Sequence, residues 1–451
     1  MRLGSAVLKY RMRIHSYTRA FFSFAAIILA GGCDASNELN ENALQGSPYL
    51  LMFAGDKDRQ ESDFVMVMDI DPVSERRGQA ISSVPIGHNS SMPHHMEYVP
   101  PPKGEPVFMN AHHHELSLMV DVSDPSAIKI DKTFLPPDSL RFPHDYTRTP
   151  SGTRLVGFLR SDGKSPTEGD DMLPGNHGGI AEYTIDGDLI RTASAAVEGA
   201  SKPIRPYAFT LLVEQDRLVV TSAPMMENVW ADVVQIFRYS DFELLHTLEL
   251  PVGHLANGQV VEGSQAAGFG PRALDDGSVF FNSYGCAFYH LTDIASDEPK
   301  LETVLTLKTK AMPNPNKIRG ACGVPYRIGD YWIQPAGQLN KVVVLDISDP
   351  KNPQKIFDLR TPKDFRPHWL AKDPKSDRLV LGAELDGEQG FYILRFNEQS
   401  GELKFDKAYN DRKGKGLFSR RQAGYISLEN KVWPHGDSGD AWGHAALFID
   451  P

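Results

Sequence analysis

A proline followed by His, Tyr or Arg recurs along the chain and opens successive segments of similar length. After most copies comes a short strand-like run, then a turn rich in Gly, Asp or Pro, then a second strand-like run. A regular recurrence of this kind is typical of repeat architectures built from small sheets, such as propeller blades. The seven copies are Pro93-His94, Pro143-His144, Pro206-Tyr207, Pro271-Arg272, Pro325-Tyr326, Pro367-His368 and Pro434-His435.

Runs of β-branched and aromatic residues fill the chain between these dipeptides. Residues 64–70 (FVMVMDI), 341–347 (KVVVLDI) and 390–396 (GFYILRF) are examples. No helical period persists, and Gly, Pro, Asn or Asp bound each run, so the sequence predicts an all-β chain. A double β-sandwich is the structural alternative for strands of this kind.

The two ends of the repeat array complement each other. Strand-like residues 50–84 precede the first repeat, and the last repeat, residues 433–450, is too short for four strands. Together they would complete one blade, which closes the ring and removes its open edges. We therefore expect a seven-bladed β-propeller over residues 48–451, closed by N- and C-terminal strands that share a blade.

The N-terminal region has the pattern of a lipoprotein signal. Residues 1–32 contain five Arg or Lys residues and no acid, and they include an apolar run at residues 20–30. That run is too short to span a bilayer as a mature helix. Leu-Ala-Gly-Gly directly precedes Cys33, as a lipoprotein signal peptidase requires. We expect residues 1–32 to be a signal peptide, Cys33 to carry lipid, and residues 33–47 to form a polar tether.

These features predict a lipid-anchored protein of the bacterial cell envelope that faces the periplasm, and Asp34 favours the inner membrane. Ordinary secretion with an incidental Cys, or an uncleaved anchor, are the alternatives. The formal net charge of −11 excludes generic nucleic-acid binding, which needs a dense basic surface. Cys286 and Cys322 would lie in an oxidising compartment, and the sequence leaves open whether they pair.

The residue after each repeated proline is a candidate channel residue, because the innermost strand of each blade lines the central channel of a propeller. Neutral imidazole is a good ligand for copper or zinc, and several imidazoles on a rigid scaffold suit a metal site. The structural alternative is that a Pro-aromatic start only packs the channel mouth. The expected ring consists of His94, His144, Tyr207, Arg272, Tyr326, His368 and His435.

Neighbours of the ring residues are further candidates. His95 and His94 can share a metal only at a strand end or a β-bulge, because successive strand residues point to opposite faces. Asp145 either orients a ring nitrogen of His144 or faces solvent. His444, nine residues after His435, is another candidate ligand.

The run of three histidines at residues 112–114 follows a strand. We expect it at the rim of the channel, with His112 and His114 on one face.

Residues 63–97 resemble the N-terminal blade of the selenium-binding protein family, which includes methanethiol oxidases. They show a strand ending in Asp-x-Asp-Pro-x-Ser, a second strand, a Pro-rich link and paired histidines. Residues 143–187, 205–251 and 346–350 continue the resemblance at low identity. It implies a seven-bladed propeller with a copper site that oxidises methanethiol with oxygen and water to formaldehyde, hydrogen sulfide and hydrogen peroxide.

The resemblance also implies a ligand set. The family's paired histidines would be His94 and His95, its next histidine His144, and its C-terminal histidine His435 or His444. His368 has no assignable counterpart. The cysteines that eukaryotic members carry after the paired histidines are missing, because residues 96–100 read MEYVP. Selenium binding through such a cysteine is therefore not supported.

The resulting hypothesis is a copper-dependent oxidase of a small thiol, with zinc as the other possible ion. Tyr207, Arg272, Tyr326 and Asp145 would shape or gate the site. A non-catalytic ligand- or protein-binding scaffold is the alternative, and it predicts no stoichiometric metal. A calcium-dependent lactonase-type hydrolase would need Glu, Asn and Asp at the channel end. The natural substrate and the oligomeric state are not determined by the sequence.

Overall fold

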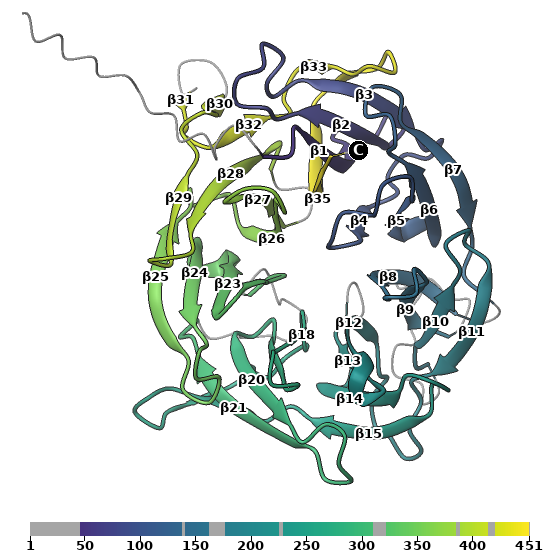
Figure 1. Ribbon diagram of the computed structural model, residues 1–451, viewed down its shortest axis with the longest axis vertical. Coiled ribbons are helices and arrows are strands. Elements are labelled where there is room, and N and C mark those ends of the chain that lie inside the picture. The colour runs from purple at the N-terminus through teal and green to yellow at the C-terminus, as the bar shows by residue number, and fades with distance from the viewer. Residues whose placement is uncertain are drawn as a thin grey trace, which may run out of the picture. The chain divides into compact units, whose positions relative to one another are not determined.

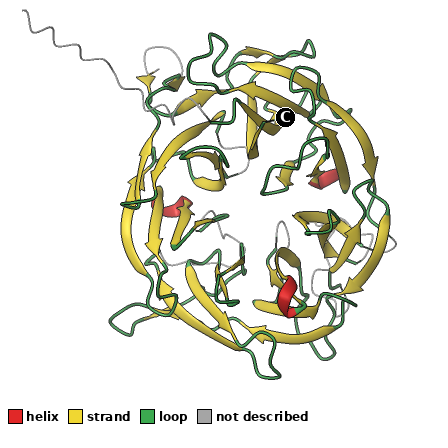
Figure 2. Ribbon diagram, in the orientation of Figure 1, coloured by secondary structure: helices red, strands yellow, loops and turns green. Residues whose placement is uncertain are grey.

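The computed structural model describes residues 46–137, 140–161, 176–224, 229–309, 322–384, 388–413 and 420–450. Within these ranges the chain forms strands and three single-turn 3-10 helices, η2 (His112–His114), η3 (Val213–Gln215) and η5 (Gly337–Leu339) (Figure 2). None of the described helices has the length and apolar character needed to cross a membrane. The predicted signal peptide and lipidated Cys33 lie outside the described residues and stay predictions.

The strands of residues 46–450 form seven blades around a central channel, each with at least four antiparallel strands, which confirms the predicted all-β propeller (Figure 1). The first three blades, in sheet order, are β3 (Ala80–Pro85), β2 (Phe64–Asp69), β1 (Tyr49–Asp56) and β35 (Ala441–Ile449); β4 (Pro93–Met96), β5 (Val107–Ala111), β6 (Leu116–Asp121) and β7 (Lys129–Phe134); and β8 (Arg141–Arg148), β9 (Arg154–Arg160), β10 (Gly179–Tyr183) and β11 (Leu189–Ser194).

The next three blades have the same four-stranded order, with the innermost strand first. They are β12 (Pro206–Leu212), β13 (Arg217–Ser222), β14 (Val233–Arg238) and β15 (Leu244–Glu249); β18 (Arg272–Ala273), β19 (Val279–Asn282), β20 (Ala287–Thr292) and β21 (Lys300–Thr306); and β22 (Tyr326–Ile328), β23 (Tyr331–Ala336), β24 (Lys341–Asp346) and β25 (Gln354–Arg360).

The last blade has an additional strand, because β32 (Tyr425–Ser427) pairs with β28 beside β29. Its other strands are β26 (Pro367–Lys372), β27 (Arg378–Ala383), β28 (Gly390–Asn397) and β29 (Glu402–Phe405). Three small hairpins complete the described strands: β16 (Gly253–His254) with β17 (Val260–Val261), β30 (Arg412–Lys413) with β31 (Arg420–Arg421), and β33 (Lys431–Val432) with β34 (Ser438–Gly439).

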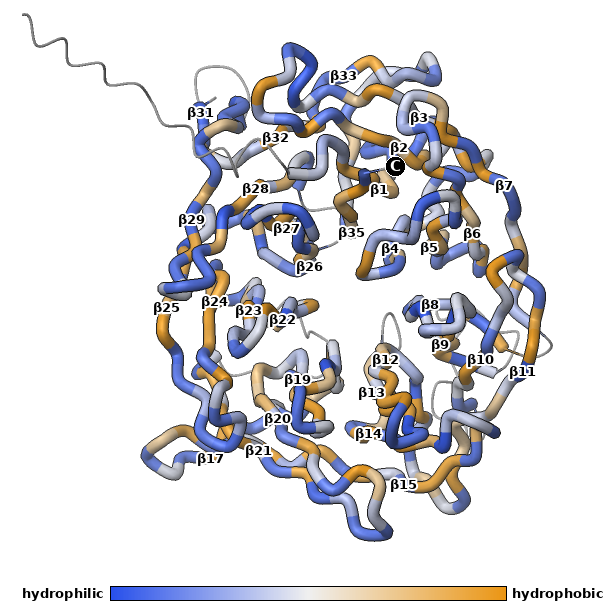
Figure 3. The backbone as a smooth tube through the Cα atoms, in the orientation of Figure 1, coloured by the Kyte–Doolittle hydropathy of each residue, from blue (hydrophilic) through white to orange (hydrophobic). Residues whose placement is uncertain are grey.

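Burial explains the sequence pattern of the strands. Middle strands such as β2 are buried at every residue, whereas the outer strand β7 alternates between exposed and half-buried residues. Blades that pack face to face bury both sides of their middle strands, so those strands are continuously apolar. Figure 3 shows apolar strands in the blades and hydrophilic turns between them.

Strand β35 closes the ring. It pairs antiparallel with β1 from Tyr49 opposite Ile449 to Asp56 opposite Ala441. The predicted blade shared by N- and C-terminal strands is therefore confirmed. This pairing occupies the inner edge of β1, which would otherwise expose unpaired backbone groups.

A disulfide joins Cys286 to Cys322 and resolves the pairing that the sequence left open. Cys286 directly precedes β20, and Cys322 precedes β22 of the next blade. Both residues are fully buried. The bond thus connects two neighbouring blades.

The innermost strands share a β-bulge beside the channel. The register shifts between Pro93 and Met96 in β4, between Pro143 and Tyr146 in β8, and between Pro206 and Phe209 in β12. β26 has a similar shift after Pro367, and β35 has one where Met52 to Ala54 of β1 oppose Ala446 to Gly443. A bulge sets two residues against one and suspends the alternation of side chains. This is the geometry required for His94 and His95 to face one site.

The predicted position of His435 in the ring of channel residues is wrong. Pro434-His435 lies in the turn between β33 and β34, and the innermost strand of the closing blade is β35. The bulge of β35 holds His444, with Gly443 at the position that proline has in the other blades. A Cβ on Gly443 would lie 2.2 Å from the Met52 sulfur, so a larger residue here would have to displace the Met52 side chain.

Candidate metal centre

Five histidines from four innermost strands converge on the channel. The Nε2 atoms of His94 and His144 are 3.0 Å apart, and the ligand atoms of His94, His95 and His444 all lie within 4.8 Å of one another. His368 joins the cluster through His444, with ring centroids 4.8 Å apart. We call these five residues the histidine cluster.

The rings of the histidine cluster pack directly on one another. His94 stacks on His95 at 4.2 Å and on His444 at 4.4 Å between centroids, and His95 lies 4.1 Å from His144. The bulge in β4 makes this possible, because it turns both paired histidines into the channel.

Burial keeps the cluster neutral. Each of its five side chains is at most 5% exposed. Desolvation lowers the pKa of every one of these imidazoles, and neighbouring imidazoles lower the pKa of His94, His95, His144 and His444 further. Neutral imidazole is the form that binds metals.

The cluster fits a metal ion on two further counts. At least one buried ring nitrogen in each of His94, His95, His368 and His444 has no hydrogen-bond partner among the described residues. Buried polar atoms without a partner are rare and call for an explanation such as an ion. The 3.0 Å between the His94 and His144 Nε2 atoms also matches two ligands on one ion, which lie about 2.9 to 3.4 Å apart at metal–nitrogen bonds of about 2.0–2.1 Å.

A backbone carbonyl orients His144. Its Nδ1 donates to the Tyr207 carbonyl oxygen at 2.8 Å, which leaves the lone pair on Nε2, facing His94. Asp145 does not perform this task. Its Oδ2 accepts from the backbone N–H of Phe209 at 3.1 Å and from the Thr147 hydroxyl at 3.2 Å, and burial raises the pKa of Asp145 to about 6.

His112 lies next to the cluster rather than at the rim. It is buried, and its ring centroid is 5.7 Å from that of His94. The single turn η2 points His112 inward and leaves His114 exposed against His88, so the two do not share a face. Burial lowers the pKa of His112 to about 4.

His435 lies apart from the cluster. Its Nδ1 is 2.6 Å from the Ser83 hydroxyl and its Nε2 is 3.2 Å from Asp437. Its ring packs on Phe64, 4.8 Å between centroids. These contacts place it at the outer strands of the closing blade.

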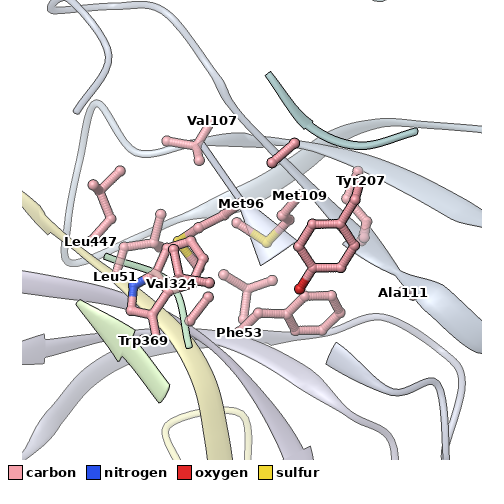
Figure 4. Close-up of a cluster of buried hydrophobic side chains, with 14 of the residues drawn as sticks. Leu51, Phe53, Met96, Val107, Met109, Ala111, Tyr207, Val324, Trp369 and Leu447 are labelled. Carbon is pink, nitrogen blue, oxygen red and sulfur yellow. The ribbon is translucent and has the colours of Figure 1, made fainter. Parts of the chain in front are cut away.

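The other ring candidates come from the three blades between those of His144 and His368. Tyr207 packs on His144 with centroids 3.9 Å apart, and Figure 4 shows Tyr207 and Trp369 among buried apolar side chains. Arg272 donates to the Pro325 carbonyl oxygen at 3.0 Å. Tyr326 is half-buried, and burial raises its pKa.

Besides Trp369, whose ring centroid lies 5.2 Å from that of His95, two further aromatic residues next to the cluster were not predicted from the sequence. Phe269 lies 4.3 Å from Tyr207 and 6.1 Å from His368 between centroids. Tyr98 brings its hydroxyl to 3.3 Å from His95 Nδ1. Each had a weak signal in the sequence: Phe269 stands between two glycines, and Tyr98 follows the paired histidines by three residues.

Fold and site together define a seven-bladed β-propeller with a buried histidine cluster in its channel. No protein-family model and no curated protein matches the sequence. Among solved structures, it is similar to a hypothetical selenium-binding protein from Sulfolobus tokodaii, at 13% identity and a TM-score of 0.64, covering 89% of this chain and 93% of that one.

Two lactonase structures are also similar. One is a periplasmic gluconolactonase from Pseudomonas aeruginosa, at 11% identity and a TM-score of 0.54, with 89% of this chain and 99% of that chain covered. The other is a putative 6-phosphogluconolactonase from Bacteroides fragilis, at 12% identity and a TM-score of 0.50, with coverages of 84% and 97%. At such identities the likeness shows the fold alone, because one propeller fold serves many chemistries.

Proposed function

We propose that the histidine cluster binds one copper ion and that the protein uses it to oxidise a small thiol. The observation that carries this proposal is the set of buried, neutral imidazoles, four of which have at least one ring nitrogen without a hydrogen-bond partner among the described residues. Imidazole suits copper and zinc alike, and the resemblance of residues 63–97 to the selenium-binding protein family favours copper.

The proposed reaction converts methanethiol, oxygen and water to formaldehyde, hydrogen sulfide and hydrogen peroxide. The thiol carbon loses two electrons, which reduce oxygen to peroxide, and water supplies the aldehyde oxygen. Bound copper would supply the redox chemistry and Lewis acidity for this reaction.

The chain's own groups prepare the site. The buried cluster and the aromatic rings of Tyr207 and Phe269 exclude bulk water, which strengthens electrostatic interactions there. Arg272 places a cation over the ring of Tyr98, next to the cluster, where it attracts a thiolate. A small apolar thiol matches this mixture of one cation and aromatic faces.

The proposed location is the periplasmic side of the bacterial envelope, with the lipid on Cys33 as the only membrane contact and no nucleic-acid partner. The Cys286–Cys322 disulfide supports an oxidising compartment. We propose no hydrolase activity, because the groups that converge in the described channel are imidazoles and a lactonase-type calcium site needs carboxylate and amide oxygens.

Metal analysis tests the proposal. The protein is expressed with its own N-terminus in the presence of copper, extracted in mild detergent and analysed by elemental mass spectrometry and electron paramagnetic resonance. We expect about one copper ion per chain with nitrogen hyperfine structure from imidazole ligands. The metal-bearing protein should then release peroxide and sulfide from methanethiol.

A double substitution, His94→Ala with His144→Ala, should abolish the bound copper. His246→Ala is the matched control, because His246 lies on the outer strand β15 and should leave the copper content unchanged. A wild-type protein that stays metal-free after copper loading would instead support a non-catalytic binding scaffold. Copper that persists in the folded double variant would contradict the assignment of the site.

A further inference from the structure

Tyr98 is held in the channel by groups from three blades. It follows β4, and its ring stacks on Trp369 of β26 with centroids 4.9 Å apart and planes 13° apart. The guanidinium carbon of Arg272, on β18, lies over the same tyrosine ring at 5.0 Å. A stacked neighbour and a cation over the ring fix the direction of the Tyr98 hydroxyl.

The Tyr98 hydroxyl stands between a cluster histidine and a carboxylate. It lies 3.3 Å from His95 Nδ1, and it also interacts with the Asp145 carboxyl group. Asp145 uses Oδ2 for Phe209 and Thr147, while its buried Oδ1 makes no hydrogen bond of ordinary geometry within the described chain.

Hydrogen-bond polarity then fixes the tautomer of His95. Of the two neighbours, the carboxylate can only accept, so we infer that the Tyr98 O–H is directed at Asp145 and that its oxygen is left to accept from His95 Nδ1–H. His95 Nε2 consequently carries the lone pair. It is also the buried ring nitrogen of His95 that has no partner among the described groups. In metal sites the second ring nitrogen of a ligating histidine is commonly tied down in this way.

We propose that Tyr98 is a positioning residue of the histidine cluster. Its hydroxyl links the Asp145 carboxyl group to His95 Nδ1 and so keeps His95 Nε2 oriented toward the metal. This inference rests on the proposed function, because it assigns the second sphere of the same site. Asp145 acts on His95 of the neighbouring blade through Tyr98, and it does not act on His144 beside it.

The test compares two phenylalanine substitutions in the full-length protein. Tyr98→Phe keeps the ring between Trp369 and Arg272 and removes only the hydroxyl. We expect copper affinity, measured by chelator competition, to fall about 10-fold or more, with altered hyperfine couplings at full occupancy. Tyr289→Phe is the control, because its hydroxyl donates to the Pro251 carbonyl oxygen at 3.0 Å in another blade; affinity and spectrum should stay as in the wild type.

A second substitution makes the relay itself testable. Asp145→Asn should lower copper affinity to a similar degree. The double variant with Tyr98→Phe and Asp145→Asn should bind copper only slightly more weakly than either single variant, because both substitutions break the same series of contacts to His95. Wild-type affinity and spectrum in Tyr98→Phe would overturn the inference, as would fully additive losses. A wild-type protein without copper would refute the proposed function instead, so the two failures are distinguishable.

Discussion

The two sides of the channel have the same backbone and different chemistry. β4, β8 and β12 carry the same bulge after a proline. In β4 and β8 the bulge presents imidazoles, whereas in β12 it presents Tyr207 and Ala208, which pack in the apolar core. The repeat therefore determines where a side chain points, and the identity of that side chain decides between a metal site and packing.

The two sides also differ in whether their buried polar atoms have hydrogen-bond partners. On the imidazole side, buried ring nitrogens lack partners in the described structure. On the other side, Tyr207, Phe269 and Tyr284 form a chain of ring contacts at 4.3 and 5.2 Å. Truncation on the aromatic side should thus lower stability and leave metal binding intact, whereas the imidazole side should determine metal binding and the pH dependence of stability.

The largest expected effect concerns pH and the imidazole side. Burial lowers the pKa of the cluster histidines from the ordinary value of 6.5. The unfolded chain therefore binds protons at higher pH, so their contribution to stability is present above pH 6.5 and is lost as pH falls.

His112, with its pKa lowered from 6.5 to about 4, would alone contribute on the order of 3 kcal/mol to this loss. Thermal unfolding of metal-free protein from neutral pH to pH 4.5 measures the effect. A melting temperature that stays constant over this range would show that the imidazoles are not buried as described.

The aromatic side should respond to truncation of Phe269. Its backbone N–H donates to the Asn282 carbonyl oxygen at 2.7 Å, and a Cβ on Gly270 would lie 2.5 Å from Pro325, so the backbone here has little room to collapse. Phe269→Ala should cost about 3 kcal/mol or more in free energy of unfolding. Denaturant unfolding gives the loss, and copper stoichiometry should not change. Loss of copper in the folded variant would show that the aromatic side is also needed for metal binding.

The smallest expected effect comes from His435→Ala. This histidine shares the proline-histidine sequence of the ring residues but contacts Ser83 and Asp437 instead. Copper content and affinity should equal those of the wild type within error. A loss of copper in this variant would show that His435, as predicted from the sequence, and not His444, is the ligand from the closing blade.

Much of the architecture could be predicted, because it depends on local patterns. The prolines marked six innermost strands, and the N- and C-terminal half-blades predicted closure. His444 was only a secondary candidate, because Gly443 replaces the marker proline beside Met52. The inward turn of His112 depends on the single-turn helix η2.

The remaining features could not be predicted, because they depend on contacts between residues that are far apart in the sequence. The Cα atoms of Cys286 and Cys322 are 5.2 Å apart although 36 positions separate them in sequence. Tyr98 meets Trp369 and Arg272 only after the ring has formed. Sequence periodicity describes individual blades, and such contacts between blades lie beyond it.

The closing strand has a consequence for biosynthesis. β35 supplies both the last edge of the ring and His444, and a ribosome makes it after every other described strand. A chain in which β35 has not yet paired with β1 therefore holds an incomplete set of ligands. Metal capture would be coupled to completion of the fold, so that a truncated or unfinished copy would hold a redox-active ion poorly. Closure of the ring would thus limit redox reactions of the bound ion in incompletely folded copies of the protein.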